Sequence, residues 1–296
     1  MKQLLYSPGE PAGIGVDSLL HISKLKFWEE MNSNLICIAD LDLLRSRAKA
    51  LNLNLTFEEL KSLNNAKQNK KGIIQFFQVE KCKDVSPGKL NHENAQYIIK
   101  NLNFGIKQAL KNKKIGLVTG PIQKSNIIEG GFKSFQGHTE WIKKHTKSKE
   151  VVMLLAAKNI KVALATTHIP LAEVSNNIQK LKLVEIIKIL NSGLKSNFKI
   201  KNPSIKVLGL NPHAGEKGKI GKEELLKINP AVKICREIGI NVSYARSADT
   251  AFNSDQLRET DAYLAMYHDQ ALPVLKALSF GKAVNITLGT PIVRTS

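Results

Sequence analysis

The sequence predicts an α/β protein whose sheet is largely parallel. Two observations support this prediction. Short apolar runs rich in Val, Ile and Leu alternate with longer amphipathic stretches, which is the pattern of strands buried between layers of helices. A chain of 296 residues with 43% hydrophobic and 23% charged residues is also long enough to bury a sizeable core.

The first half of the chain is predicted to alternate strand and helix. Asp40 follows the second apolar run, where its carboxylate can cap a helix by accepting hydrogen bonds from the first turn. Over residues 91–111, apolar side chains recur at the spacing of a helix face. The predicted elements are strands at 4–7, 35–39, 73–79 and 115–118, and helices from about 16, from 41 to 51 and over 91–111.

The second half begins with two apolar runs, 151–156 and 161–166, separated by a short turn-like segment. They indicate an antiparallel pair inserted into the alternation. The remaining predicted elements are a helix over 181–194 and strands at 205–210, 262–266 and 284–288, the last of these being the final strand. The sequence has no internal repeat and no linker that divides it cleanly. We therefore expect two interleaved subdomains, one formed by 1–133 with 280–296 and the other by 134–279.

The distribution of apolar residues argues against a secreted protein and against a membrane-spanning protein. The N-terminus reaches Pro8, Gly9 and Glu10 before an apolar stretch long enough for a signal sequence. The longest apolar runs, such as 151–157, are far shorter than the roughly 20 residues that cross a bilayer. We therefore expect a cytoplasmic protein with no membrane partner.

The charge and the cysteines also bear on possible partners. The formal net charge of +19 favours anionic ligands, but the lysines are spread along nearly every segment and only 6% of residues are aromatic. Nucleic-acid sites usually show a concentrated basic patch with stacking aromatics, so we expect no nucleic-acid partner. Cys37, Cys82 and Cys235 are odd in number and far apart, which predicts reduced, inert thiols.

Three histidines come directly after predicted strands, at His168, His213 and His268. Ligands bind at the carboxyl edge of a parallel sheet because the loops there converge. One such histidine alone is more often structural or at the surface, but three in the same position favour a divalent-metal site. Neutral imidazoles accept zinc, cobalt, nickel or manganese, so the residues do not select the ion.

A fourth histidine, His138, follows Gly137 and precedes Thr139. The ordinary pKa of histidine lies near neutrality, so His138 is a candidate general acid or base and Thr139 a candidate ligand contact. The alternative is that Thr139 or a neighbour caps a helix over 140–147 and that His138 is exposed. The residues alone favour neither.

A candidate phosphate site lies near the end of the chain. Lys276, Asn285 and Arg294 supply two cations and an amide donor, which suit a phosphate group. Two glycine-bearing segments do not add nucleotide loops. The glycines of 7–15 do not fall at the Rossmann spacing, and 218–223 lacks the spacing and the Ser or Thr of a Walker loop.

Eight segments in order resemble the signature segments of the 4-hydroxythreonine-4-phosphate dehydrogenase family. They are Pro-Gly-Glu-Pro-Ala-Gly-Ile-Gly at 8–15, Thr-Gly-Pro-Ile at 119–122, Gly-His-Thr-Glu at 137–140, Thr-Thr-His-Ile-Pro-Leu at 166–171, Leu-Asn-Pro-His-Ala-Gly-Glu at 210–216, Ala-Asp-Thr at 248–250, Ala-Met-Tyr-His-Asp-Gln at 265–270 and Val-Asn-Ile-Thr-Leu-Gly at 284–289. The resemblance implies a fold like that of isocitrate and isopropylmalate dehydrogenases, with two α/β/α subdomains and a cleft between them. It also implies a homodimer whose active site lies at the subunit interface, with most metal and dimer contacts in the second subdomain.

The resemblance assigns roles to individual positions. His168, His213 and His268 match the ligands of one divalent ion per subunit (zinc, magnesium, cobalt or manganese), in a site shared between subunits. The positions that match substrate-binding residues are His138, Thr139, Lys276, Asn285 and Arg294. Asp249 matches an acidic position that assists proton transfer, so His138 and Asp249 are the expected catalytic residues. No position is assigned to the NAD or NADP cofactor.

The implied reaction is the NAD-dependent oxidation of 4-phosphooxy-L-threonine to 2-amino-3-oxo-4-(phosphooxy)butanoate. That product decarboxylates to 3-amino-2-oxopropyl phosphate in vitamin B6 synthesis. Two alternatives are a dehydrogenase of threonate or erythronate 4-phosphate and a non-catalytic, phosphate-binding descendant. Val16, the segment 244–247 and Ala271 depart from the family pattern, and the family sequence continues beyond the position of Ser296 through an Asp-His-Gly-Thr segment.

Overall fold

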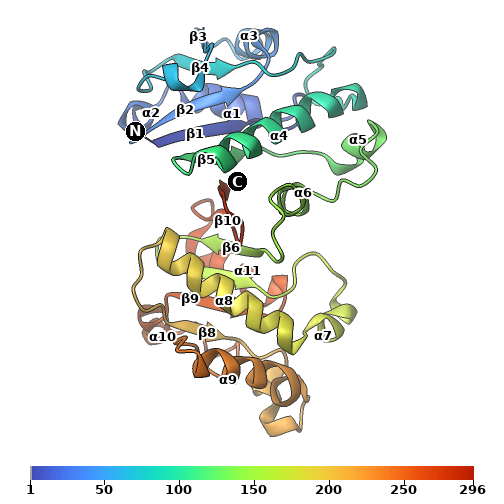
Figure 1. Ribbon diagram of the computed structural model, residues 1–296, viewed down its shortest axis with the longest axis vertical. Helices are drawn as coiled ribbons and strands as arrows, with labels where there is room; N and C mark the ends of the chain where they lie inside the picture. The colour runs from blue at the N-terminus through green and yellow to red at the C-terminus, as the bar shows by residue number, and fades with distance from the viewer. Residues whose placement is uncertain (1) are drawn as a thin grey trace. The chain divides into compact units, whose positions relative to one another are not determined.

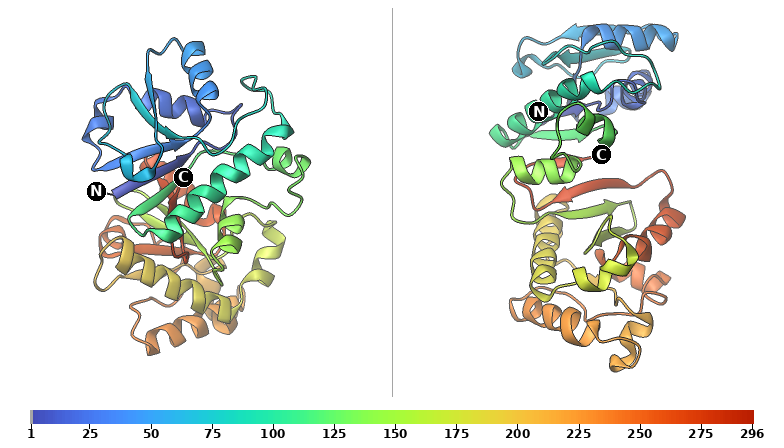
Figure 2. Two further views of the ribbon diagram at one scale, coloured as in Figure 1. Left: turned by 45° about the horizontal axis from the view of Figure 1, so that its top comes forward. Right: turned by 90° about the vertical axis from the view of Figure 1, so that its right-hand side faces the viewer.

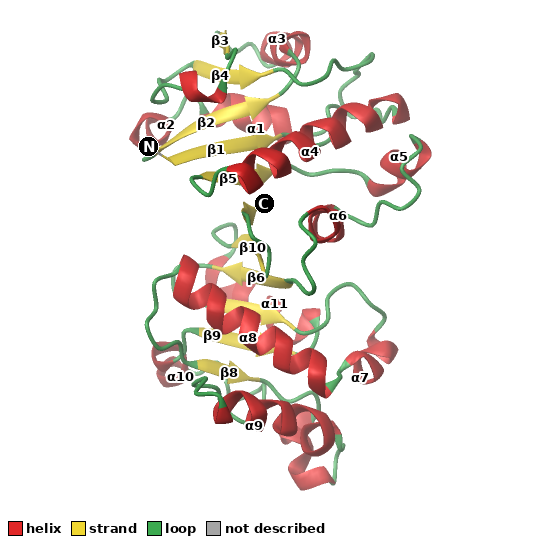
Figure 3. Ribbon diagram, in the orientation of Figure 1, coloured by secondary structure: helices red, strands yellow, loops and turns green. Residues whose placement is uncertain are grey.

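The computed structural model describes residues 2–296, which form two compact units (Figure 1). Unit 1 contains the residues up to Lys147 together with Thr290–Ser296, and unit 2 contains Ser148–Gly289. Strands and helices alternate along both units (Figure 3). The predicted α/β class is therefore confirmed.

The sheet of unit 1 has the strand order β3-β4-β2-β1-β5-β11, and its strand pairs are parallel. Its strands are β1 (Lys2–Ser7), β2 (Ser33–Ile38), β3 (Thr56–Glu59), β4 (Ile73–Phe77), β5 (Ile115–Thr119) and β11 (Val293–Thr295). Its helices are α1 (Gly15–Ile22), α2 (Lys26–Glu30), α3 (Leu41–Ala50), α4 (Ala95–Lys111), α5 (Lys124–Glu129) and α6 (His138–His145), with short 3-10 turns at Leu63–Asn65 and His92–Asn94.

The predicted cap of α3 is confirmed. The Asp40 carboxylate accepts hydrogen bonds from the backbone N–H groups of Asp42 at 2.6 Å and Leu43 at 3.3 Å. These N–H groups have no partner within the helix, because they lie in its first turn. The cap fixes the point at which the chain leaves β2 and enters the helix.

The sheet of unit 2 has the order β10-β6-β7-β9-β8. Its strands are β6 (Val152–Ala156), β7 (Lys161–Leu164), β8 (Ile205–Val207), β9 (Ala262–Ala265) and β10 (Val284–Leu288). Its helices are α7 (Val174–Asn177), α8 (Lys180–Asn197), α9 (Asn229–Glu237), α10 (Ser254–Glu259) and α11 (His268–Ser279), with 3-10 segments at Leu171–Glu173 and Pro212–Gly218 and a π-helical turn at Glu224–Ile228. The pair β6 and β7 is antiparallel, as predicted, while β7, β9 and β8 are mutually parallel neighbours.

Alternation along the strands of unit 2 builds a core on each face of its sheet. Ala163 and Leu264 join one apolar cluster with α8 and α9, whereas Val162 and Tyr263 join another cluster with α11. Figure 2 shows α8 and α9 on one side of this sheet and α11 on the other. Successive side chains of a strand point to opposite faces, so both faces of these strands are buried.

Two short strands, β3 and β11, were not predicted from the sequence. Residues 284–288 form a strand, β10, as predicted. The expectation that this strand is the last one is wrong, because β11 follows and pairs with β5 of unit 1. β11 has only three residues, and its partner is far away in the sequence. β3 has the polar sequence Thr-Phe-Glu-Glu and lies at the sheet edge, where strands need not be apolar.

The unit boundaries lie later in the sequence than the expected 133/134 and 279/280. Helix α6 belongs to unit 1 because Trp141 packs against Phe132 and Phe135 and donates a hydrogen bond from Nε1 to Asn103 Oδ1 at 2.8 Å. β10 belongs to unit 2 because it pairs with β6.

Among residues 2–296, no helix has the length and apolar character needed to cross a membrane.

Helix α8 offers a matched test of the unit 2 core. Leu190 is fully buried on this helix, while Leu181 on the same helix is 72% exposed. We expect Leu190→Ala to lower the free energy of unfolding by about 2–5 kcal/mol, because it leaves a cavity, and Leu181→Ala to change it little. Urea unfolding followed by circular dichroism measures both. Equal losses for the two variants would contradict the packing described for α8.

Candidate active site

The parallel register of β7, β9 and β8 places three loops at one edge of the unit 2 sheet. Leu164 of β7 lies opposite Ala265 of β9, and Val207 of β8 lies opposite Leu264. Beyond β7 the alignment continues, because Thr166 donates hydrogen bonds from its N–H and its Oγ1 to Met266 O, at 3.2 and 2.7 Å. The loops that carry the three predicted metal-binding histidines therefore start side by side.

His168 and His268 meet at this edge. Their ring centroids are 5.6 Å apart with an interplanar angle of 46°. A zinc ion bound by an imidazole nitrogen at roughly 2.0–2.1 Å lies about 3 Å from the ring centroid, so two rings on one tetrahedral ion have centroids about 5 Å apart. The observed separation is of this size. The pair fits joint ligation of a divalent ion.

Asp269 orients the imidazole of His268. Its Oδ1 lies 2.8 Å from His268 Nδ1, and in the tautomer that has Nδ1 protonated this is an N–H donated to a carboxylate. The lone pair of Nε2 is then available for a metal, which is the arrangement usual for metal-binding histidines. Asp269 itself is exposed.

His213 lies on a backbone turn of unusual conformation. The five residues from His213 to Lys217 all have positive φ, between 41° and 76°. Only one of them is glycine, so the other four adopt a left-handed conformation that L-residues disfavour. Such strain persists where the surrounding structure holds it, and it is often found at functional sites. The imidazole of His213 is exposed.

The structure does not bring the three histidines together within one chain. No three His, Cys, Asp or Glu side chains in the described part, residues 2–296, are grouped closely enough to hold a metal ion. His213 lies instead near Asp249, whose pKa it lowers. The three-histidine metal site therefore stays a prediction.

Asp249 is an exposed carboxylate with a lowered pKa. The hydrogen bond from Ser247 Oγ to Asp249 Oδ1, at 2.5 Å, is the main cause, and the nearby His213 adds to it. Both interactions favour the charged form. Asp249 is therefore ionised at neutral pH and is able to accept a proton.

Arg294 supplies a buried cation in unit 1. Its side chain on β11 is part of a residue only 3% exposed, and its Nε and one terminal nitrogen donate to Thr119 Oγ1 at 3.1 and 2.7 Å. Burial lowers the pKa of Arg294 to about 10, an effect partly opposed by Glu140. The guanidinium remains charged at neutral pH, and a buried cation of this kind suits an anionic ligand.

His138 is the first residue of α6 and is half-buried. Burial, and secondly the charge of Arg294, lower the pKa of His138 to about 3. Gly137, with φ of 141°, occupies the capping position, and no side chain caps the helix. The alternative in which Thr139 or a neighbour caps this helix and His138 is exposed is therefore wrong. At neutral pH His138 is an uncharged imidazole.

The predicted phosphate-binding residues are divided between the two units. His138, Thr139 and Arg294 belong to unit 1, whereas Lys276 and Asn285 belong to unit 2. Lys276 is exposed in the last turn of α11, and Asn285 lies opposite Leu155 in the pair of β10 with β6. Thr119, the hydrogen-bond partner of Arg294, was not predicted to be a site residue. It ends the apolar run of β5 and directly precedes Gly120-Pro121, within the signature segment 119–122.

The cysteines take no part in this arrangement. Cys37 and Cys235 are buried, Cys82 is half-buried, and all three are free. Burial raises the pKa of Cys235 to about 11 and raises those of Cys37 and Cys82 further. The thiols are thus protonated at neutral pH, and a protonated thiol is a poor nucleophile.

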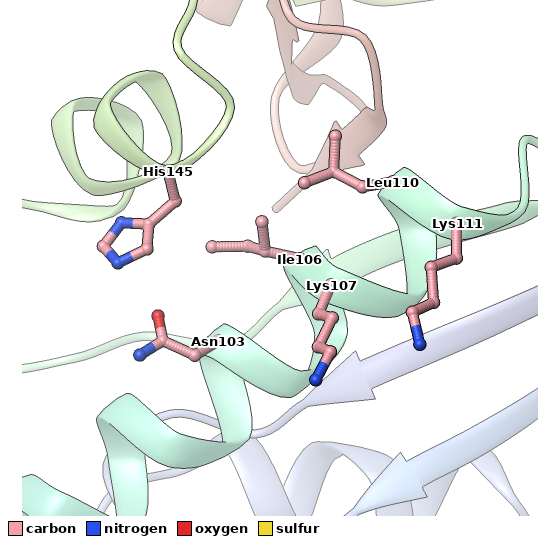
Figure 4. Close-up of a pocket in the computed structure, with 6 residues that line it drawn as sticks. All are labelled: Asn103, Ile106, Lys107, Leu110, Lys111 and His145. Atoms are coloured by element: carbon pink, nitrogen blue, oxygen red, sulfur yellow. The ribbon is translucent and has the colours of Figure 1, made fainter.

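A pocket of about 430 Å³ lies between α4 and the end of α6 (Figure 4). Its wall is mainly apolar, and it is lined by Asn103, Ile106, Lys107, Leu110, Lys111 and His145. None of these residues was predicted to bind substrate, metal or cofactor.

Comparison with known sequences identifies close relatives over the whole chain. The family model described as "Pyridoxal phosphate biosynthetic protein PdxA" matches residues 30–296. A protein of Pseudoalteromonas translucida (strain TAC 125) is 42% identical over 294 residues, which cover 99% of this chain and 88% of the relative. A protein of Yersinia pseudotuberculosis serotype O:1b (strain IP 31758) is 43% identical over 295 residues, covering 100% and 88%. Both relatives are named 4-hydroxythreonine-4-phosphate dehydrogenase.

Solved structures of proteins with the same name are also similar to this chain. The 4-hydroxythreonine-4-phosphate dehydrogenase of Klebsiella pneumoniae superposes with a TM-score of 0.89 at 28% identity, covering 100% of this chain and 90% of that chain. The corresponding enzyme of Burkholderia phymatum superposes with a TM-score of 0.88 at 28% identity, covering 100% and 89%. A terephthalate 1,2-cis-dihydrodiol dehydrogenase of Burkholderia xenovorans LB400 shares the fold, with a TM-score of 0.68 at 18% identity over 99% of this chain and 88% of that chain.

The lowered pKa of His138 predicts a specific pH dependence. The folded-state pKa of about 3 lies below the ordinary value of 6.5, so the unfolded chain binds the proton more readily between these pH values. His138 should therefore cost stability as the pH falls from about 6.5 towards 3, and His138→Gln should reduce that loss. Chemical denaturation of both proteins across this range measures the difference.

NMR titration gives an independent measurement of the same group. We expect the His138 ring signals, assigned from their loss in His138→Gln, to show no protonation down to about pH 4. Arg294→Gln should raise the His138 pKa while leaving it below 6.5, because burial is the larger cause. Titration of the wild-type His138 ring near pH 6.5 would contradict this description of its surroundings.

Proposed function

The chain belongs to the PdxA family of pyridoxal phosphate biosynthetic proteins, and from this premise we propose that it is a 4-hydroxythreonine-4-phosphate dehydrogenase. It oxidises 4-phosphooxy-L-threonine to 2-amino-3-oxo-4-(phosphooxy)butanoate, with NAD or NADP as hydride acceptor. The product is a β-keto acid, which loses carbon dioxide to give 3-amino-2-oxopropyl phosphate. The observation in the structure that carries the proposal is the pairing of His168 and His268 at the carboxyl edge of β7 and β9.

His168, His213 and His268 would hold one divalent ion, which is zinc, magnesium, cobalt or manganese. Such an ion supplies Lewis acidity that lowers the pKa of a bound alcohol. The separation of the His168 and His268 rings, 5.6 Å, and the Asp269 carboxylate behind His268 support this assignment. The protein acts as a cytoplasmic homodimer, and residues of both subunits complete each site.

The phosphate group of the substrate is bound by His138, Thr139, Lys276, Asn285 and Arg294. Arg294 contributes a buried positive charge, and its contacts with Thr119 keep the guanidinium in place before substrate arrives. The neutral imidazole of His138 can donate one N–H to a phosphate oxygen without adding a second buried charge. Binding at the phosphate orients the reacting carbon, so remote binding energy lowers the barrier to reaction.

Asp249 would take the hydroxyl proton of the substrate. Its lowered pKa keeps the carboxylate ionised at neutral pH, and Ser247 fixes its orientation. His138, whose pKa is about 3, is a weak base at neutral pH and is better suited to donating a hydrogen bond to the substrate. The nicotinamide cofactor takes the hydride that leaves the same carbon.

The activity is tested by following NADH formation with 4-phosphooxy-L-threonine, with threonate 4-phosphate and with erythronate 4-phosphate. Each assay is run after chelation and again after a divalent metal is restored. We expect metal-dependent turnover that prefers the amino substrate. Preference for threonate or erythronate 4-phosphate would identify a related dehydrogenase, and silence with all three would favour a non-catalytic, phosphate-binding protein.

The metal assignment predicts that His168→Ala, His213→Ala and His268→Ala each lower metal-dependent turnover by at least about 100-fold while the protein remains folded. His21→Ala is the matched control, because His21 is exposed in the last turn of α1 in unit 1. Full activity in any of the three variants would remove that residue from the site.

Mixing experiments test whether the site is shared between subunits. Because ligands come from both subunits, at least one pairing of two inactive histidine variants should form hybrid dimers that contain one intact site. We expect partial recovery of activity in that pairing after unfolding and refolding the mixture. Failure of every pairing, with dimers confirmed by light scattering, would show that each site is built from one chain.

A further inference from the structure

The strained turn that carries His213 is built around a buried carboxylate. The backbone of the turn is left-handed from His213 to Lys217. Residues other than glycine do not hold this conformation unless their surroundings impose it. The side chain that fills the inside of the turn belongs to Glu224, which is only 2% exposed and begins the π-helical turn Glu224–Ile228.

Glu224 contacts the turn on both sides of His213. Its Oε1 accepts a hydrogen bond from the backbone N–H of Asn211 at 2.8 Å, and its Oε2 accepts one from Asn211 Nδ2 at 2.9 Å. A Cβ atom placed on Gly209 would lie 3.1 Å from Oε1, and one placed on Gly215 would lie 2.5 Å from Oε2. The carboxylate is therefore enclosed by residues that immediately precede and follow His213 in the chain.

Asn211 links this carboxylate to a second one. Its Nδ2 also donates to Glu223 Oε2 at 2.8 Å, and Glu223 Oε1 accepts from Ser175 Oγ at 2.5 Å. The side-chain hydrogen bonds from Ser175 and Asn211 lower the pKa of Glu223 to about 2. An amide that donates to two carboxylates has no freedom to rotate, so the turn starts from a fixed point.

The base of the same loop is connected to the segment that carries His268. Gln270 Nε2 donates to Gly209 O at 2.5 Å, and Gln270 Oε1 accepts from the N–H of Met266 at 2.7 Å. Gly209 thus lies between Glu224 on one side and Gln270 on the other. The residues just before His213 are therefore tied both to Glu224 and to the segment that carries His268.

From this arrangement we propose that Glu224 is a positioning residue, which holds the left-handed turn so that His213 is presented for metal binding. The inference rests on the proposed function, in which His213 is a metal ligand. Glu224 does not itself reach the metal in this proposal. It acts by accepting two hydrogen bonds from Asn211 and by packing against Gly209 and Gly215.

Glu224→Gln tests the proposal with almost no change of volume. The glutamine amide nitrogen is a donor, so it would face either the backbone N–H or the Nδ2 of Asn211, both of which are donors as well. Calorimetric titration of chelator-treated protein with Zn²⁺ alone should show a loss of affinity of about 10- to 100-fold. Because Glu224 is not a ligand, saturating Zn²⁺ should restore kcat in this variant but not in His213→Ala.

Glu216→Gln is the matched control. Glu216 lies in the same turn, carries the same charge and is exposed. We expect its Zn²⁺ affinity to stay within about twofold of wild type, since an exposed charge is screened by solvent. Equal losses in Glu216→Gln and Glu224→Gln would show a general charge effect and overturn the proposal, as would unchanged affinity in Glu224→Gln.

A second variant covers the case in which Glu224→Gln does not fold. In Gly209→Ala, Glu224 keeps its carboxyl group, but the new Cβ would lie 3.1 Å from Oε1 and 2.8 Å from Ala214 Cα. We expect a loss of Zn²⁺ affinity there too, with circular dichroism unchanged, and wild-type affinity would overturn the proposal. Wild-type Zn²⁺ affinity in His213→Ala would instead refute the metal site itself, and would leave Glu224 with no ligand to position.

Discussion

The arrangement of the candidate site depends on the parallel register of β7, β9 and β8. These strands are neighbours, and their carboxyl ends lie at one edge of the unit 2 sheet. The loops that follow them carry His168, His268 and His213, so one backbone constraint brings all three segments to the same edge. A shift of β9 by one residue would turn its side chains to the opposite face and separate His268 from His168. Both faces of these strands are buried, which is why the register is strongly specified.

Each of the two units contains one unfavourable feature that its own surroundings stabilise. In unit 2 the left-handed turn at His213 follows Asn211, which donates two hydrogen bonds to Glu224. In unit 1 the buried guanidinium of Arg294 has Thr119 as a hydrogen-bond partner. Neither feature would be stable alone, because one strains the backbone and the other removes a charge from water. Preorganised groups of this kind do not have to be ordered when the substrate binds, so more of the binding energy remains for orienting it.

The large positive charge of the chain differs from a single buried cation in what it contributes to the binding of anions. The net charge of +19 comes from lysines spread over the whole sequence, and such a distribution adds only a general attraction for anions. Specific recognition needs a cation held in a defined position, and Arg294 in unit 1 is such a cation. The low pKa of His138 follows from its burial and from this neighbouring charge.

The sequence by itself determined the α/β class, most strands and helices, the Asp40 cap and the histidines that follow β7, β8 and β9, because these depend on local periodicity and on residues near in the chain. It also contained the ordered segments that place the chain in its family. Only the tertiary structure decided that β11 pairs with β5, that Arg294 is buried beside Thr119, that His138 is neutral and that Glu224 lies inside the His213 turn. Each of these depends on contacts between residues distant in sequence. A pattern of residue types along the chain predicts which segments are buried, but it does not say which distant residues they contact.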